Sequence, residues 1–204
     1  MSEILNLFPQ PVYITKDYKL SEEEKKFLMD NTAMAFENSG KNFTSAERYI
    51  LDKPELTKFK EFLIKSVNDF THNELKINKK VEFYITQSWV NKNPPGTFHH
   101  QHLHYNSLIS SVFFINGGSS PIKFNRQTTN YIFPMIELER DEYNISNSDS
   151  WTINNEENSL ILFPSSLGHC VEENTNNFDR YTLSFNTYVK GTLGGFKEAT
   201  ELKL

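Results

Sequence analysis

The chain has 204 residues, a net charge of −5 at pH 7, and hydrophobic and aromatic fractions of 37% and 14%. This apolar content is enough for the core of one domain and excludes wholesale disorder. Acidic and basic residues are interspersed, which argues against nucleic acid or an anionic membrane as a partner. Binding of single-stranded nucleic acid through a local patch stays open. The one cysteine, Cys170, excludes an internal disulfide and a cysteine-based metal site.

The N-terminus lacks the basic start and long apolar segment of a secretory signal, and no apolar run is long enough to span a membrane. We therefore expect a soluble cytoplasmic protein. We expect one domain over residues 1–204. Residues 1–80 would supply an N-terminal strand and helical support, residues 81–190 a β core, and residues 191–204 a C-terminal tail.

Two helices are expected in the first third of the chain, after an edge strand within residues 4–15. Ser21 and Glu24 have capping-box spacing and begin the first helix, which we expect to end before Ser39-Gly40. One side of this helix is predicted to carry Phe27, Leu28, Asn31, Met34 and Ala35. The second helix starts at Pro54 and continues to about residue 75. Both would pack on the outside of a sheet; a partner-binding role for their apolar faces is the alternative.

From residue 81 the pattern changes to period two, which is typical of strands. The first strand ends at the turn 93–96. One of its predicted faces consists of Val81, Phe83, Ile85, Gln87 and Trp89, and the opposite face consists of Glu82, Tyr84, Thr86 and Ser88. Further strands are predicted at Leu108–Ile115, Ile122–Asn125, Tyr131–Ile136, Trp151–Ile153, Leu160–Phe163 and Tyr181–Val189. Many short strands after two helices indicate a mainly β fold with α, an antiparallel sandwich or jelly roll with helical support.

Four of the six histidines lie within six positions: His99, His100, His102 and His104. Two histidines spaced i, i+2 on a strand point to the same face, so either His102 with His104 or His100 with His102 can converge on one ion. His169, which follows a later apolar run, would supply a third ligand from a neighbouring strand. Three imidazoles suit zinc, copper, iron or nickel. The alternative is a solvated surface loop without a ligand role.

The last predicted strand has one polar face. Alternation gathers four polar residues on it: Arg180, Thr182, Ser184 and Asn186. An arginine flanked by hydroxyls suits the wall of a polar pocket, because its guanidinium can bind a carboxylate through two parallel hydrogen bonds. The alternative is a surface strand on which Arg180 pairs with Glu172 or Asp179.

These elements together resemble a known family. The matching stretches are Leu7–Tyr13, Trp89-Val90-Asn91 before Gly96, His102-x-His104 followed by Leu108–Ile115, Leu162–Ser165 before His169, and Arg180–Asn186. In order and spacing they resemble the 2-oxoglutarate- and Fe(II)-dependent oxygenases, and within them a group found in bacteria and phages.

The resemblance implies a double-stranded β-helix (jelly roll) that binds Fe(II) and 2-oxoglutarate. It makes His102, His104 and His169 the metal ligands, and the catalytic set contains nothing beyond them. Arg180 would hold the distal carboxylate of 2-oxoglutarate with Thr182, and Asn91 and Ser184 would be further cosubstrate contacts. The implied reaction hydroxylates a small molecule or a protein side chain and decarboxylates 2-oxoglutarate to succinate.

The sequence departs from the wider superfamily at the second ligand. That superfamily has His-x-Asp or His-x-Glu there, whereas this chain has His104 and no acid between Glu82 and Glu137. A neutral imidazole in place of a carboxylate raises the charge of the site by one unit, which favours dianionic 2-oxoglutarate and makes zinc occupancy an alternative. The resemblance gives His99 and His100 no ligand role.

Two other classes of function stay open at this stage. One is a non-catalytic or zinc-occupied metal-binding jelly roll of the cupin type, and the other is a structural or interaction protein that retains the fold. A carboxylate clamp at Arg180 argues against the first, and the three histidines argue against the second. We expect the substrate to be selected by the loops Thr128–Ile136 and Glu139–Ser150, and a homodimer stays open.

Overall fold

The computed structural model describes residues 3–30, 34–118, 121–127, 136, 138–154 and 156–204. The strands are β1 (Tyr13–Thr15), β2 (Met34–Glu37), β3 (Phe43–Ser45), β4 (Val81–Asn93), β5 (His99–His102), β6 (Ile109–Phe114), β7 (Ile122–Asn125), β8 (Ser150–Ile153), β9 (Leu160–Pro164), β10 (His169–Val171), β11 (Arg180–Leu193) and β12 (Leu202–Lys203). The helices are α1 (Glu22–Asp30) and α2 (Thr57–Asn68), with 3₁₀ turns at Ile50–Asp52 and Pro54–Leu56 and a π-helical turn at Asp69–Glu74.

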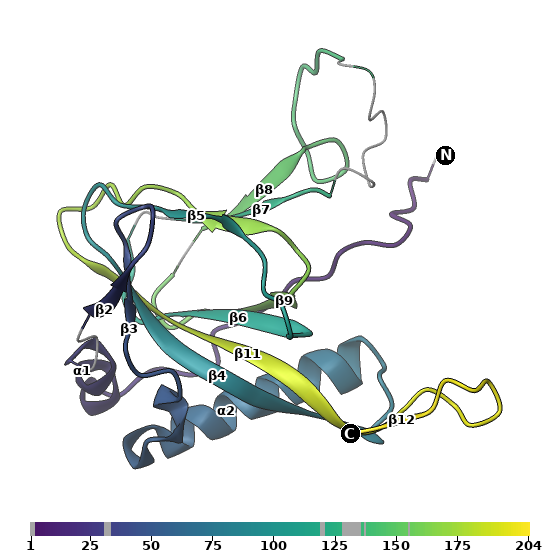
Figure 1. The fold of residues 1–204 in the computed structure, drawn as a ribbon. Coiled ribbons are helices and arrows are strands. Elements are labelled where there is room, and N and C mark those ends of the chain that lie inside the picture. Colours follow the sequence, from purple (N-terminus) through teal and green to yellow (C-terminus); the bar gives the residue numbers. More distant parts are fainter. Residues whose placement is uncertain (1–2, 31–33, 119–120, 128–135, 137, 155) are drawn as a thin grey trace.

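Within these residues the strands form two sheets that face each other (Figure 1). The larger sheet has eight strands in the order β1-β9-β6-β11-β4-β3-β2, with β12 paired to β11. The smaller sheet has four strands in the order β5-β10-β7-β8. All ladders between named strands are antiparallel. From β4 to β11 the chain crosses repeatedly between the two sheets in the manner of a β-sandwich, with β7 and β8 as a consecutive pair in the smaller sheet.

The helices cover the outer face of the larger sheet, and α2 runs beneath it in Figure 1. Phe59 of α2 packs edge-on against Phe113 of β6, with ring centroids 4.7 Å apart. α1 begins with the predicted capping box: the Glu24 backbone N–H donates to Ser21 Oγ (3.1 Å), and the Ser21 N–H donates to Glu24 Oε2 (2.8 Å). No described helix combines the length and apolar character that a membrane crossing requires.

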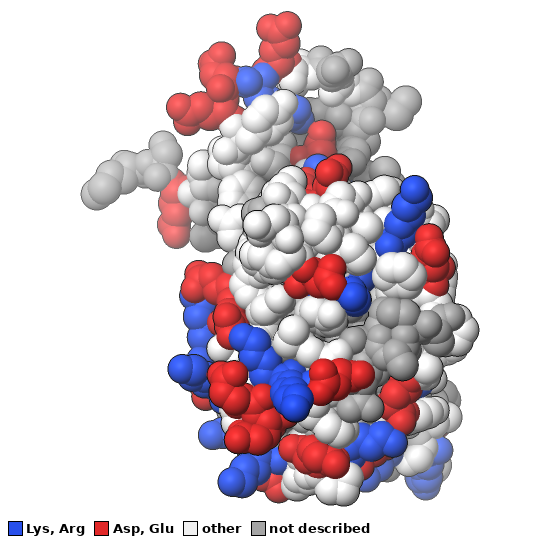
Figure 2. Space-filling model, turned by 90° about the vertical axis from the view of Figure 1, so that its left-hand side faces the viewer, with Lys and Arg blue, Asp and Glu red and all other residues white. Residues whose placement is uncertain are grey.

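An apolar cluster lies between the two sheets. Its buried members are Val112, Phe114, Ile122, Phe124, Ile161, Phe163 and Leu167. They come from both sheets, so this cluster holds the sheets together and borders the candidate site. Charged side chains lie outside: on the face shown in Figure 2, basic and acidic residues are interspersed over the lower part, at the height of the helices in Figure 1.

The region between residues 30 and 45 differs from the sequence-based expectation. The first helix ends at Asp30, and Met34–Glu37 form the strand β2, which pairs with β3 and extends the larger sheet. The helix predicted to continue toward Ser39 is therefore wrong in its second half. Spacing of apolar residues alone misled the prediction, because a short edge strand next to a helix carries too few residues to establish its own period.

The predicted strands from residue 108 onward are confirmed where they are described, with β6, β7, β8, β9 and β11 at the expected places. The predicted strand Tyr131–Ile136 and the predicted loop Thr128–Ile136 lie outside the described residues except for Ile136. The second predicted helix is confirmed as α2 with its flanking turns, beginning at Pro54 and ending at Glu74.

Candidate metal centre

The smaller sheet brings two distant histidines together. β5 and β10 are antiparallel neighbours, and His169 lies directly opposite His102 in their register. His169 was predicted to need such a neighbouring strand in order to reach the other histidines. His104 lies two residues beyond the end of β5, in the connection to β6, and not on a strand with His102 as predicted. Its backbone N–H donates to the carbonyl of Ser165 (3.1 Å), which fixes this connection beside β9.

The rings of His102, His104 and His169 converge. Each offers a ring nitrogen, and these three atoms lie within 4.8 Å of one another. His104 Nε2 lies 3.4 Å from His169 Nε2. Two nitrogens bound at about 2.1 Å to one tetrahedral ion are roughly 3.4 Å apart, so the spacing fits two ligands of one ion.

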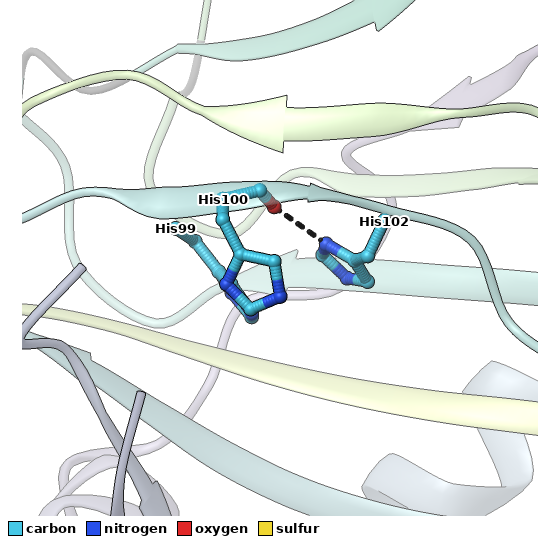
Figure 3. A group of neighbouring side chains, drawn as sticks. All are labelled: His99, His100 and His102. Carbon is cyan, nitrogen blue, oxygen red and sulfur yellow. Dashed lines mark hydrogen bonds between the residues drawn. The ribbon is translucent and has the colours of Figure 1, made fainter. Parts of the chain in front are cut away.

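Backbone carbonyls set the orientation of two of these rings. His102 Nδ1 donates to the carbonyl of His100 (2.8 Å; Figure 3), and His169 Nδ1 donates to the carbonyl of Leu167 (3.0 Å). A proton held on Nδ1 leaves the lone pair on Nε2, which faces the cluster. Metal-bound histidines are oriented in the same way by hydrogen bonds from their second ring nitrogen.

Burial keeps these imidazoles neutral. Desolvation lowers the pKa of His104 to about 4 and that of His169 to about 3, and it lowers the pKa of His102 as well. Neutral imidazole is the form that binds a metal, because the imidazolium has no free lone pair. The residues present therefore fit a divalent transition-metal ion.

A cleft with about 410 Å³ of open space, including its mouth to solvent, adjoins the histidines. Its polar wall comes from β4 and β11 of the larger sheet and includes Asn91, Arg180, Thr182 and Ser184. Apolar side chains such as Phe163 complete the lining. The structure thus brings all seven predicted site residues to one cleft. Among the residues that the structure describes, none that lines the cleft is an acid.

Arg180 belongs to this wall and not to a surface strand. It is only 1% exposed, and its Cζ lies 5.8 Å from the centre of the Phe114 ring. The acids considered as its surface partners pair with other residues: Asp179 with Lys92 (2.7 Å) and Glu172 with Lys123 (3.8 Å). Burial lowers the pKa of Arg180 to about 10, which leaves it cationic at neutral pH.

Asn91 reaches the wall because of a β-bulge in β4. In the register with β11, Ile85 lies opposite Thr187 and Ser88 opposite Phe185, so β4 has one extra residue. Phe83 consequently faces the helices, whereas Trp89 and Asn91 line the cleft. The prediction that Trp89 shares a face with Phe83 is therefore wrong.

Hydrogen bonds hold Asn91 in this position. Its Nδ2 donates to Ser184 Oγ (3.1 Å), and its Oδ1 accepts from Trp89 Nε1 (3.2 Å). Trp89 also stacks on His104, with ring centroids 5.9 Å apart. The residues that follow the bulge thus connect His104 to Ser184 through Trp89 and Asn91.

A further lining residue is His99, to which the sequence assigned no ligand role. His99 faces the cleft and stacks on His102 with ring centroids 4.4 Å apart. Its pKa is lowered to about 2, first by desolvation and then by the neighbouring histidines. The only signal in the sequence was the dense histidine run itself.

Comparison with known proteins agrees with this geometry. Residues 87–186 match the family model described as "Putative 2OG-Fe(II) oxygenase". This region is similar to that family. The match runs from β4 to β11 and includes every residue of the proposed metal and cosubstrate site. The family implies Fe(II) and 2-oxoglutarate. No curated protein sequence matches the chain.

Solved structures show the same fold at low sequence identity. A 2OG-Fe(II) oxygenase family oxidoreductase from Burkholderia pseudomallei is 12% identical, with a TM-score of 0.56 over 86% of this chain and 83% of that chain. A prolyl-4-hydroxylase from Pseudomonas putida is 12% identical, with a TM-score of 0.52 over 87% and 92%. HygX from Streptomyces hygroscopicus, solved with nickel, 2-oxoglutarate and hygromycin B, is 10% identical, with a TM-score of 0.58 over 87% and 82%. The jelly-roll fold is confirmed.

Proposed function

We propose that the protein is a 2-oxoglutarate- and Fe(II)-dependent dioxygenase. It would hydroxylate an organic substrate, a small molecule or a protein side chain, while 2-oxoglutarate is decarboxylated to succinate. The observation that carries the proposal is the placement of three inward-facing imidazoles and one buried arginine around a single cleft. A plain metal-binding barrel has no need of a buried guanidinium beside its metal.

The histidines would hold the metal. His102, His104 and His169 offer three neutral nitrogens, and the carbonyls behind His102 and His169 keep two of the rings in a binding orientation. Bound iron supplies the activation of dioxygen and the oxidising power that no side chain provides. The residues' own task is to fix the ion and leave coordination positions for its ligands.

The β11 wall would bind 2-oxoglutarate. The Arg180 guanidinium matches a carboxylate in shape and charge, and burial strengthens that interaction by removing competing water. The Thr182 hydroxyl lies two residues along the same face and can donate to the same carboxylate. Ser184 Oγ accepts from Asn91, so its own hydrogen is directed elsewhere and is available to the cosubstrate.

Charge balance favours a dianionic cosubstrate. Three neutral imidazoles leave the two positive charges of a divalent ion uncompensated, and the cationic Arg180 lines the same cleft. Among the described residues the lining contains no acid, so an anionic ligand would stabilise the site. The two carboxylates of 2-oxoglutarate offset both charges of the ion, which a single ligand carboxylate does not.

Zinc occupancy is a second candidate, and the donor set is the observation that favours it. Three histidines with an open fourth position form the catalytic zinc site of carbonic anhydrase. A zinc-filled site would bind 2-oxoglutarate without oxidising it, so metal content and turnover must be measured on the same sample.

The test is succinate production under air. Wild-type protein loaded with Fe(II) is expected to convert 2-oxoglutarate to succinate, slowly alone and faster with a true substrate in a screen of small molecules and peptides. The His169→Ala variant is expected to produce none. Wild type that binds Fe(II) but forms no succinate with any substrate would refute the dioxygenase proposal and favour the zinc-occupied or non-catalytic form.

A further inference from the structure

A second group of histidines lies next to the candidate metal centre. The ring nitrogens of His99, His100 and His102 also lie within 4.8 Å of one another. All three residues belong to β5, and their rings extend from the same side of this strand (Figure 3). Ordinary strand alternation would instead place His99 on the opposite face from His100 and His102.

A bulge in β5 explains this arrangement. His102 lies opposite His169 and His99 lies opposite Val171, so three steps along β5 correspond to two along β10. The extra residue falls within His100–Gln101 and turns His99 to the inner side, where it stacks on His102. The His100 ring centroid lies 5.2 Å from that of His99 and 5.6 Å from that of His102.

We propose that His99, His100 and His102 form an outer binding position for a divalent transition-metal ion. The inner position is the one formed by His102, His104 and His169, and the two positions share His102. Imidazole donors select zinc, nickel, copper or iron over magnesium and calcium, which prefer oxygen ligands. This inference does not depend on the dioxygenase activity.

Hydrogen bonding makes the two positions mutually exclusive. His102 Nδ1 donates to the His100 carbonyl, so His102 has only Nε2 to offer to a metal. One lone pair serves one ion at a time. An ion in the outer position therefore withdraws His102 from the inner one, and the chain binds one ion in total at this cluster.

The outer position is open to solvent on one side. His100 is exposed, and its Nδ1 lies 3.2 Å from Ser39 Oγ, which leaves Nε2 for an ion. His99 and His102 are half-buried and line the wall behind it. An ion can thus reach the outer position without opening the cleft.

The test removes the inner position and measures what remains. Tag-free protein is titrated with Zn(II) by calorimetry, with circular dichroism as the check of folding. His104→Ala/His169→Ala is expected to bind one ion more weakly than wild type. Adding His99→Phe and His100→Gln to this background is expected to weaken zinc binding further. The loss should exceed the roughly 10- to 100-fold that is typical when a hydrogen bond that only orients a metal ligand is removed. Wild type is expected to bind one ion.

The matched control adds His72→Gln to the His104→Ala/His169→Ala variant. His72 is the remaining histidine, and its ring hydrogen-bonds to the carbonyl of Ile77, away from the cluster. Where the double variant does not fold, the single His104→Ala variant replaces it. Zinc binding that disappears with the inner ligands alone would overturn the proposal. So would binding that survives the changes at His99 and His100, or two ions bound to wild type.

Discussion

Replacing Arg180 by methionine tests the cosubstrate wall. Methionine keeps an unbranched apolar chain against Phe114 and removes the guanidinium. Arg180 is 1% exposed and lines the cleft, so a carboxylate bound there would be paired with it away from bulk water. The variant should therefore lose affinity for 2-oxoglutarate while keeping the three histidines.

The expected loss follows from the burial of the pair. Truncating one partner of a buried, hydrogen-bonded charge pair costs about 2–5 kcal/mol. At about 1.4 kcal/mol per tenfold change, the dissociation constant of 2-oxoglutarate should rise roughly 30- to 4,000-fold. An exposed ion pair would change it by less than about tenfold, because its median contribution is only about 0–1 kcal/mol.

The assay is an anaerobic titration of the Fe(II) protein with 2-oxoglutarate, followed by the visible charge-transfer absorption of the complex. Lys92→Met is the matched control: Lys92 lies opposite Tyr181 on the neighbouring strand, pairs with Asp179, and does not line the cleft. It removes one positive charge close by in the fold and should leave the affinity unchanged. Equal affinities for Arg180→Met and wild type would refute the assignment of the wall.

Three further predictions concern the same cleft. Thr182→Val, which keeps the shape and removes one hydroxyl, should weaken 2-oxoglutarate binding by about 0.5–1.5 kcal/mol in the same titration, and an unchanged affinity would exclude a contact. Acidifying the metal-free protein from pH 6.5 to about 5 should lower its thermal midpoint, because unfolded histidines with a pKa of 6.5 take up protons that buried His104 and His169 do not. A flat profile in this window would contradict their burial. Deleting Gln87 removes the extra residue of the β4 bulge and should abolish 2-oxoglutarate binding by turning Trp89 and Asn91 away from the cleft; retained binding would refute the role of the bulge.

Much of the site could be predicted from local patterns. Alternation along residues 180–186 identified Arg180, Thr182 and Ser184 as one face, and the structure places all three on the cleft. The need for a strand beside the histidine run is met by β10, which carries His169 opposite His102. These inferences succeeded because strand periodicity is a short-range property that the chain itself determines.

The two bulges could not be predicted. A bulge is a mismatch between two paired strands, and a single sequence does not state which residues will pair. One error of facing arose there, because Trp89 was assigned to the side of Phe83. His99, which had been left without a ligand role, lines the cleft because of the other bulge. Bulges are frequent next to active sites because they re-aim a side chain, so alternation is least reliable where function matters most.

The central claim is that three histidines and one arginine hold iron and 2-oxoglutarate together in one cleft. The most direct measurement is the visible spectrum of the wild-type protein without oxygen. We predict an absorption band that requires both Fe(II) and 2-oxoglutarate, with one equivalent of each bound per chain. A protein that binds Fe(II) but gives no band at saturating 2-oxoglutarate would contradict the account.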